Sequence, residues 1–261
     1  MRQRERSIVP TSIVSVPLPA GALAGSYQPG ARADFAVLWV HGFGSHRGGE
    51  KAEAVRAECE RRGWAFAAFD FRGHGASPGR IVDLTCSGLL DDLALVREWL
   101  AGRGHTKLGL IGSSMGGFAA AWFAKQNPVS VVGCVFLAPA FLFLERRWSR
   151  LTPEEQIAWA RTGRLAVKNQ WLETEIGIGL MDERARFRPE DLVKDWATPA
   201  LLFHGMADDV VPDSDSLFFA RNVGYPRVEL RLIKDGDHRL TAHKDDIAGA
   251  AGAFFARLLS G

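Results

Sequence analysis

The sequence has little cysteine, and the arrangement of the few that it has excludes two classes of site. Only 3 of its 261 residues are cysteine: Cys59, Cys86 and Cys134. They are odd in number, lie far apart and form no C-x-x-C pair, as is usual for thiols in a reducing compartment. We therefore expect neither a disulfide framework nor a cysteine-rich metal site.

The chain also lacks an excess of charge and a long apolar run. Lys and Arg total 32 against 30 Asp and Glu, and this net charge of +2 provides no broad basic face for nucleic acid. The longest apolar run, residues 131–144, contains Gly133 and Pro139 and is too short to cross a bilayer as a helix. No apolar signal-peptide core follows the charged residues 1–10. These features predict a cytoplasmic protein with no membrane span and no nucleic-acid partner.

Short apolar runs alternate with amphipathic stretches along most of the chain. They follow two alternating stretches, 13–16 and 23–27, which predict a leading hairpin. The runs are typical of strands buried on both faces of a parallel sheet and span 35–40, 64–69, 108–111, 131–137, 200–203 and 228–233. Helical periodicity occurs at 51–62, 87–100, 115–126, 214–221 and 243–259. The pattern predicts an α/β fold, with helices on both faces of a mostly parallel central sheet.

No strand pattern occurs from Pro139 to Pro199, although this interval contains half of the 8 tryptophans. A structureless loop of this length is uncommon in a compact domain, so we expect 139–199 to be a small helical lid inserted into a core formed by 1–138 and 200–261. Large apolar side chains in a lid suit an acyl chain, and we expect three of them to line the substrate pocket: Trp148, Trp159 and Trp171. The alternative is that these aromatic residues only pack the inserted helices together.

The sharpest local signal is the G-x-S-x-G motif at 112–116, between a predicted strand and a predicted helix. Such a turn forces its central serine into a tight bend, where Gly112 and Gly116 avoid side-chain clashes. Ser114 is therefore the candidate nucleophile. The same bend aims the first turn of the helix at the reaction centre, so the backbone N–H of Met115 can donate to a developing oxyanion.

A serine nucleophile needs a base, and an imidazole base needs an oriented carboxylate. Asp208 follows the predicted strand 200–203, and His238 follows the predicted strand 228–233. The carboxyl ends of strands are where α/β sheets build their sites, which favours these two residues as acid and base. Asp209 is the alternative acid, but we expect it to face water or to cap the next helix.

Other histidines and glycine turns have different expected roles. His41, His74 and His204 lie beside glycines in loops after strands, where they can fix the loops by hydrogen bonds. In the turn 41–44 the backbone can approach a substrate closely, so the N–H of Phe43 is the second candidate oxyanion donor. The sequence contains no H-E-x-x-H zinc motif, no G-x-G-x-x-G and no Walker A lysine, so we expect no metal and no nucleotide.

With these residues identified, the sequence resembles the α/β-hydrolase superfamily from about residue 35 to its end. The resemblance rests on the segments HGFG at 41–44, DFRGHGAS at 70–77, GSSMGG at 112–117 and HGMADDVVP at 204–212. The last of these and DHRL at 237–240 look most like the mitochondrial palmitoyl-protein thioesterase and acyl-glucuronide esterase branch and its bacterial relatives. The resemblance implies a Ser114–Asp208–His238 triad, an oxyanion hole of the Phe43 and Met115 amides, and no cofactor. The 139–199 segment departs from the family, so the resemblance does not extend to the choice of substrate.

These observations favour hydrolysis of a small-molecule carboxylic ester or thioester through an acyl-enzyme on Ser114. A second hypothesis keeps the triad for carbon–carbon bond or aminoacyl-peptide hydrolysis, with selectivity set by the lid. A third is a ligand-binding receptor that retains a hydrolase shell without turnover, against which the intact triad spacing argues. Nothing in the sequence indicates an oligomeric state.

Overall fold

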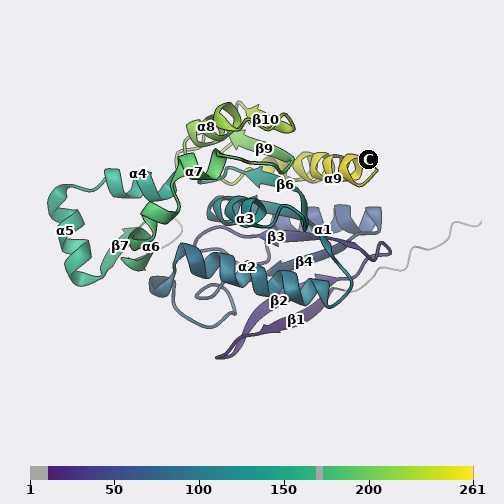
Figure 1. Cartoon of the computed structure of the whole chain (residues 1–261), viewed down its shortest axis with the longest axis horizontal. Helices are drawn as coiled ribbons and strands as arrows, with labels where there is room; N and C mark the ends of the chain where they lie inside the picture. Colours follow the sequence, from purple (N-terminus) through teal and green to yellow (C-terminus); the bar gives the residue numbers. More distant parts are fainter. Residues whose placement is uncertain (1–10, 169–172, 261) are drawn as a thin grey trace, which may run out of the picture.

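A mostly parallel eight-stranded sheet forms the centre of the computed structural model, which describes residues 11–168 and 173–260 (Figure 1). Its strand order is β1-β2-β4-β3-β5-β6-β9-β10. The strands are β1 (Ser12–Pro17), β2 (Ala22–Gln28), β3 (Phe35–Val40), β4 (Ala65–Phe69), β5 (Lys107–Ser113), β6 (Val131–Leu137), β9 (Ala200–Gly205) and β10 (Val228–Ile233). The β1–β2 hairpin joins the sheet antiparallel to β4, and the pairs from β4 to β10 are parallel. The predicted fold class is confirmed.

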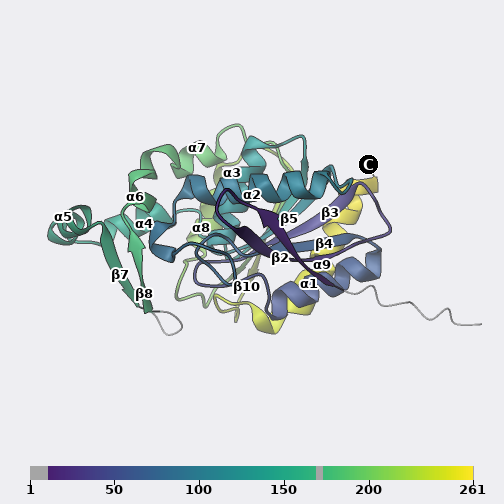
Figure 2. The same cartoon turned by 90° about the horizontal axis from the view of Figure 1, so that it is seen from below.

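Helices cover both faces of the sheet, as Figures 1 and 2 show. They are α1 (Glu50–Arg62), α2 (Cys86–Ala101), α3 (Met115–Gln126), α8 (Ser214–Asn222) and α9 (Lys244–Ser260), with short 3-10 turns at Ile81–Asp83, Arg184–Arg186 and Thr241–His243. Side chains of β3 alternate between the two resulting cores. Leu38 packs with residues of α2 and α3, whereas Val37 packs with residues of α1 and α9. This two-sided burial explains why the strand is apolar at every position.

The segment between β6 and β9 differs from its prediction. It contains the helices α4 (Phe143–Ser149), α5 (Pro153–Thr162), α6 (Gly179–Asp182) and α7 (Pro189–Val193), and also the strands β7 (Arg164–Lys168) and β8 (Glu173–Gly177). These strands pair antiparallel in a separate two-stranded sheet, so the prediction that this helical segment contains no strand is wrong. Each strand buries little more than one apolar side chain, Val167 or Ile176, and such short, exposed strands leave a weak alternating pattern.

Most of this segment projects from one side of the sheet, as α4, α5, α6 and β7 show in Figure 1. Helix α7, in contrast, packs on α3 and contributes the buried Leu192 to the main core. Division of the chain into a core and a lid at residues 139 and 199 stays a prediction. In the described part of the chain, no helix is both long enough and apolar enough to cross a membrane.

Candidate active site

Ser114 lies at the sharp turn where β5 ends and α3 begins. Its φ of 54° and ψ of −120° are unfavourable for a residue with a side chain, a strain that clusters at functional sites. The turn depends on its glycines, because a Cβ atom at Gly112 would overlap the carbonyl group of Gly116, and one at Gly116 would overlap that of Val40. Substitution of either glycine would therefore displace the loop that presents the Ser114 hydroxyl.

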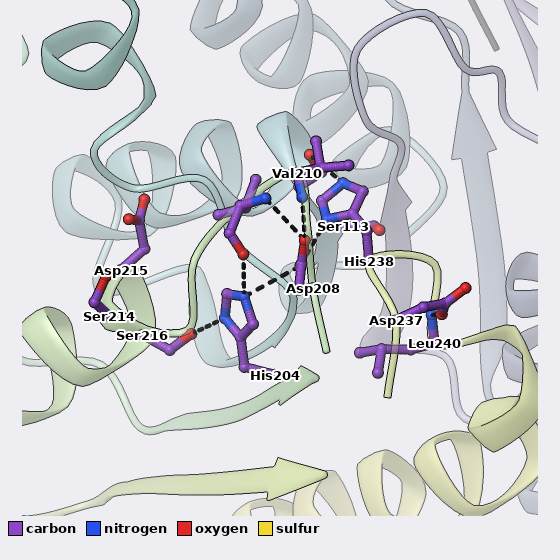
Figure 3. Close-up of polar contacts among 12 residues, drawn as sticks. Ser113, His204, Asp208, Val210, Ser214, Asp215, Ser216, Asp237, His238 and Leu240 are labelled. Atoms are coloured by element: carbon purple, nitrogen blue, oxygen red, sulfur yellow. Dashed lines mark hydrogen bonds and ion pairs between the residues drawn. The ribbon is translucent and has the colours of Figure 1, made fainter. Parts of the chain in front are cut away.

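The structure brings Ser114, His238 and Asp208 together from three separate strand ends. The Ser114 Oγ lies 3.1 Å from His238 Nε2. His238 Nδ1 lies 2.8 Å from Asp208 Oδ2 (Figure 3). A carboxylate only accepts, so Nδ1 carries the proton and Nε2 is left to accept the serine hydroxyl. The loops bearing Asp208 and His238 meet closely, since a Cβ atom at Gly205 would overlap the carbonyl group of Gly236.

The carboxylate of Asp208 is fully buried and accepts several hydrogen bonds. Its Oδ1 accepts from the backbone N–H groups of Val210 at 2.9 Å and Val211 at 2.8 Å, and its Oδ2 also lies 3.2 Å from His204 Nε2. Burial raises the pKa of Asp208, but the hydrogen bonds from His204 and His238 outweigh it and hold the pKa below its usual range. Asp208 therefore stays ionised beside His238, whereas Asp209 is exposed to solvent.

His204 connects the acid loop to the rest of the core. Its buried ring accepts from Ser216 Oγ at 2.7 Å through Nδ1 and donates through Nε2 to the carbonyl oxygen of Val211 at 2.9 Å. The sequence predicts a loop-fixing histidine here, but not its contact with Asp208 or the contribution of Ser216. The signal available was a histidine at a strand end, four residues before the candidate acid.

His41 holds the turn that carries Phe43. Its Nδ1 donates to the carbonyl oxygen of Gly42 at 2.8 Å, and its Nε2 accepts the N–H of Phe71 at 3.0 Å. Burial lowers the pKa of His41 to about 4, so the ring is neutral at physiological pH and can make both bonds.

The candidate oxyanion donors are the backbone N–H groups of Phe43 and Met115. Phe43 and Met115 both line the pocket that contains Ser114. Among the hydrogen bonds of the described residues, none uses the backbone N–H of Phe43 or Met115. Both groups are therefore available to a ligand oxygen. A side chain at Gly42 would press on Ser114, since its Cβ atom would lie 3.2 Å from the Cβ of Ser114.

Lys51 is a neighbour of the site that sequence reasoning missed. Its Nζ donates to Ser113 Oγ at 3.0 Å, beside Ser114. Burial lowers the pKa of Lys51 to about 8, and the nearby Arg239 adds to the decrease. A lysine in the first turn of an amphipathic helix carries no sequence signal of such a contact, because the contact joins α1 to the end of β5.

A pocket of about 290 Å³ adjoins Ser114 and His238. Apolar residues form much of its wall: Phe43, Met115, Ala140, Phe143, Leu151, Val167, Ile176, Leu180, Val210 and Val211. The polar groups on it come mainly from α4 and its end: Arg146, Arg147 and Arg150, with Asp215 from α8. Across residues 11–168 and 173–260, no three His, Cys, Asp or Glu side chains are grouped as a metal site would require.

The expected tryptophan lining differs from the structure. Trp148 and Trp159 do not line the pocket; their rings lie 6.4 Å apart, and Trp159 is only 1% exposed. They pack α4 against α5, which is the alternative role considered for them, while β7, β8 and α6 supply the pocket wall. The sequence pattern does not show that β7 and β8 replace the tryptophans in the pocket wall, because it does not indicate the β7–β8 hairpin. Trp171 lies outside the described residues.

His41 should make the stability of the protein depend on pH. Its pKa is about 4 in the folded chain against 6.5 without burial, so between these values the unfolded chain binds a proton that the folded chain does not. We expect the free energy of unfolding, measured by urea denaturation, to fall as the pH falls from 6.5 to 4, by up to about 3 kcal/mol. The stability difference between wild type and His41→Gln should shrink over this range; a constant difference would contradict the assignment.

Comparisons with known proteins agree with this geometry. Residues 31–186 match the family Hydrolase_4, described as "Serine aminopeptidase, S33". The mitochondrial palmitoyl-protein thioesterase ABHD10 of Mus musculus is 28% identical over 222 residues, which cover 80% of this chain and 70% of that protein. The crystal structure of a putative hydrolase from Agrobacterium vitis S4 has a TM-score of 0.82 and 26% identity, and the match covers 94% of this chain and 98% of that one.

A further solved structure gives the same fold. The alpha/beta hydrolase domain-containing protein 10 from mouse has a TM-score of 0.82 at 24% identity, with 95% of this chain and 98% of that chain covered. The family match spans more than half of the sequence and includes the turn at Phe43 and the serine elbow. The chain therefore belongs to this family of α/β-hydrolase serine hydrolases.

Proposed function

We propose that the protein hydrolyses a small-molecule carboxylic ester or thioester through an acyl-enzyme on Ser114. The observation that carries this proposal is the hydrogen-bonded series from Ser114 Oγ to His238 at 3.1 Å and from His238 to Asp208 at 2.8 Å, beside a largely apolar pocket. A pocket of about 290 Å³ is at the lower end of the range for small-molecule sites, which favours a small substrate.

In the proposed reaction, His238 Nε2 takes the proton of Ser114 as Oγ attacks the substrate carbonyl carbon. Asp208 stabilises the imidazolium ion that forms. The backbone N–H groups of Phe43 and Met115 donate to the oxyanion of the tetrahedral intermediate. His238 then gives its proton to the leaving alcohol or thiol, and afterwards activates the water that releases the acid. These steps need no metal or cofactor.

The relatives support an acyl substrate of this kind. The mouse protein that is 28% identical is named for hydrolysis of palmitoyl-protein thioesters. The family description instead names an aminopeptidase, whose substrates carry a terminal ammonium group. An ammonium group is poorly suited to this pocket, because Arg147 and Arg150 line it and its carboxylate Asp215 is paired with Arg146. An ester or thioester is therefore the better substrate class.

Ser114→Ala should abolish turnover of p-nitrophenyl esters and leave the fold intact, because it removes one hydroxyl from a partly exposed position. Activity should fall by roughly a thousandfold or more, the usual size of a triad deletion. Labelling by a fluorophosphonate probe should disappear in the same variant, with thermal unfolding as the control. Labelling that persists would identify a different nucleophile.

Separate asparagine substitutions at Asp208 and Asp209 test which of the two carboxylates orients His238. Asp208→Asn should lower kcat by roughly two to four orders of magnitude, since an amide disturbs the hydrogen bond to His238 Nδ1. Asp209→Asn is the matched control, because its side chain is exposed, and it should keep nearly full activity. Steady-state kinetics in which the Asp209 variant is the inactive one would refute the assignment.

Leu180 should influence the preference for acyl chain length, because it lines the pocket. Leu180→Ala removes apolar contact with a longer acyl chain and should lower kcat/KM for a hexanoyl ester roughly tenfold relative to an acetyl ester. Trp159→Phe is the control, since Trp159 is buried away from the pocket. It should lower the melting temperature and leave the ratio of the two esters unchanged. A parallel loss with both esters in Leu180→Ala would exclude this role.

A further inference from the structure

Arginines occupy the face of α4 that lines the active-site pocket. Phe143, Arg147, Arg150 and Leu151 all line the pocket, and their spacing of three and four residues places them on one side of the helix and its end. An inward helix face is normally apolar, as Phe143 and Leu151 are. Arginines at two positions of this face break that pattern, and such departures are expected at functional sites.

The third arginine of this helix has a structural explanation. Arg146 Nε donates to Asp215 Oδ1 at 2.6 Å, and its Nη2 donates to Ser214 Oγ at 2.9 Å. The other oxygen of Asp215 accepts the backbone N–H of Leu142 at 2.9 Å. Arg146 therefore joins α4 to α8 and neutralises the buried carboxylate on the pocket wall.

Arg147 and Arg150 have no comparable partner. Neither side chain forms an ion pair or a hydrogen bond with any of the residues that the structure describes. The nearest acidic residue on their helix, Glu145, pairs with Arg184 at 2.8 Å. Arg147 is half-buried, and its burial together with the charge of Arg150 lowers the pKa of its guanidinium. The half-buried charge of Arg147 costs free energy because no described carboxylate compensates it, whereas Arg150 is exposed and adds a second positive charge to the pocket lining.

We propose that Arg147 and Arg150 form a subsite for an anionic oxygen group of the substrate, a carboxylate or a phosphate. This inference rests on the proposed hydrolysis at Ser114 and narrows its substrate class to esters or thioesters that carry such a group. Guanidinium groups suit it because their planar array of donors matches carboxylate and phosphate oxygens in pairs. The apolar wall contacts the uncharged part of the substrate, while the anion neutralises the two arginines.

Paired substrates that differ in a single charge test the subsite from both sides of the scissile bond. On the acyl side, the mono-p-nitrophenyl ester of hexanedioic acid is compared with p-nitrophenyl hexanoate. On the leaving-group side, the butanoyl ester of 4-hydroxybenzoate is compared with that of 4-hydroxybenzamide. The kcat/KM values are measured for wild type, for the double variant Arg147→Gln/Arg150→Gln, and for Arg161→Gln. Arg161 is the matched control, because it is an exposed arginine on α5 that does not line the pocket.

We expect wild type to prefer the anionic ester of at least one pair. In the double variant the ratio of kcat/KM between the anionic and the neutral ester should fall about tenfold or more, mainly through KM for the anionic ester. Arg161→Gln should retain the preference, and raised salt should weaken it in wild type. A preference within the hexanedioic acid pair places the anion in the acyl group, and a preference within the hydroxybenzoate pair places it in the leaving group. Equal kcat/KM within both pairs, a preference that survives in the double variant, or a preference lost equally in Arg161→Gln would overturn the proposal.

Binding separates a failure of this inference from a failure of the proposed function. Hydrolysis of neutral esters without a charge preference would overturn the subsite alone. Absence of turnover with every ester would overturn the proposed function, and the subsite is then decided by calorimetric binding of 4-hydroxybenzoate against 4-hydroxybenzamide and of adipamate against adipamide. Tighter binding of an anion by wild type, abolished in the double variant, supports the subsite. Equal binding of anion and amide overturns it.

Discussion

The buried charge of Asp208 is the constraint on which the arrangement of the site depends. A carboxylate removed from water is stable only if donors surround it, and here the donors come from its own loop, from His204 and from His238. His204 is in turn held by Ser216 on α8. The position of His238 is thus tied to β9 and α8, so the same bonds that stabilise the charge also orient the imidazole toward Ser114.

Parallel topology explains how residues so far apart in sequence reach one place. The strands β3, β5, β9 and β10 run in the same direction, so the loops that follow them emerge at one edge of the sheet. Those loops carry Phe43, Ser114, Asp208 and His238. Glycines permit their close approach, since Cβ atoms at Gly42, Gly116 and Gly205 would all press on backbone or on Ser114. The parallel sheet therefore brings these four residues together at one edge.

What the sequence predicts well is local or follows from strong periodicity. The sharp turn at Ser114 was predictable because a strand, a glycine turn and a helix specify it within a few residues. The continuous apolar runs of the buried strands likewise indicated the sheet. Residues whose role depends on contacts across the fold were not predictable. Lys51 meets Ser113 only because α1 packs beside the end of β5, and the β7–β8 hairpin buries too few side chains to leave a clear pattern. The rings of Trp148 and Trp159 pack together, and Val167, Ile176 and Leu180 line the pocket in their place.

The segment between β6 and β9 forms a large part of the pocket wall beside Ser114. It supplies an apolar wall from β7, β8 and α6, and positive charge from α4, whereas the proposed nucleophile, base and acid all come from the sheet edge. On the proposed function, the charge of this wall selects among acyl substrates that the nucleophile, base and acid treat alike. A terminal ammonium group would need a free carboxylate on that wall. Asp215, the carboxylate that lines the pocket, has both oxygens engaged by Arg146 and the backbone of Leu142. With Asp215 neutralised by Arg146, the charge that the wall has left to offer a substrate is the positive charge of Arg147 and Arg150, which on the proposed function disfavours a terminal ammonium group and favours an anionic one.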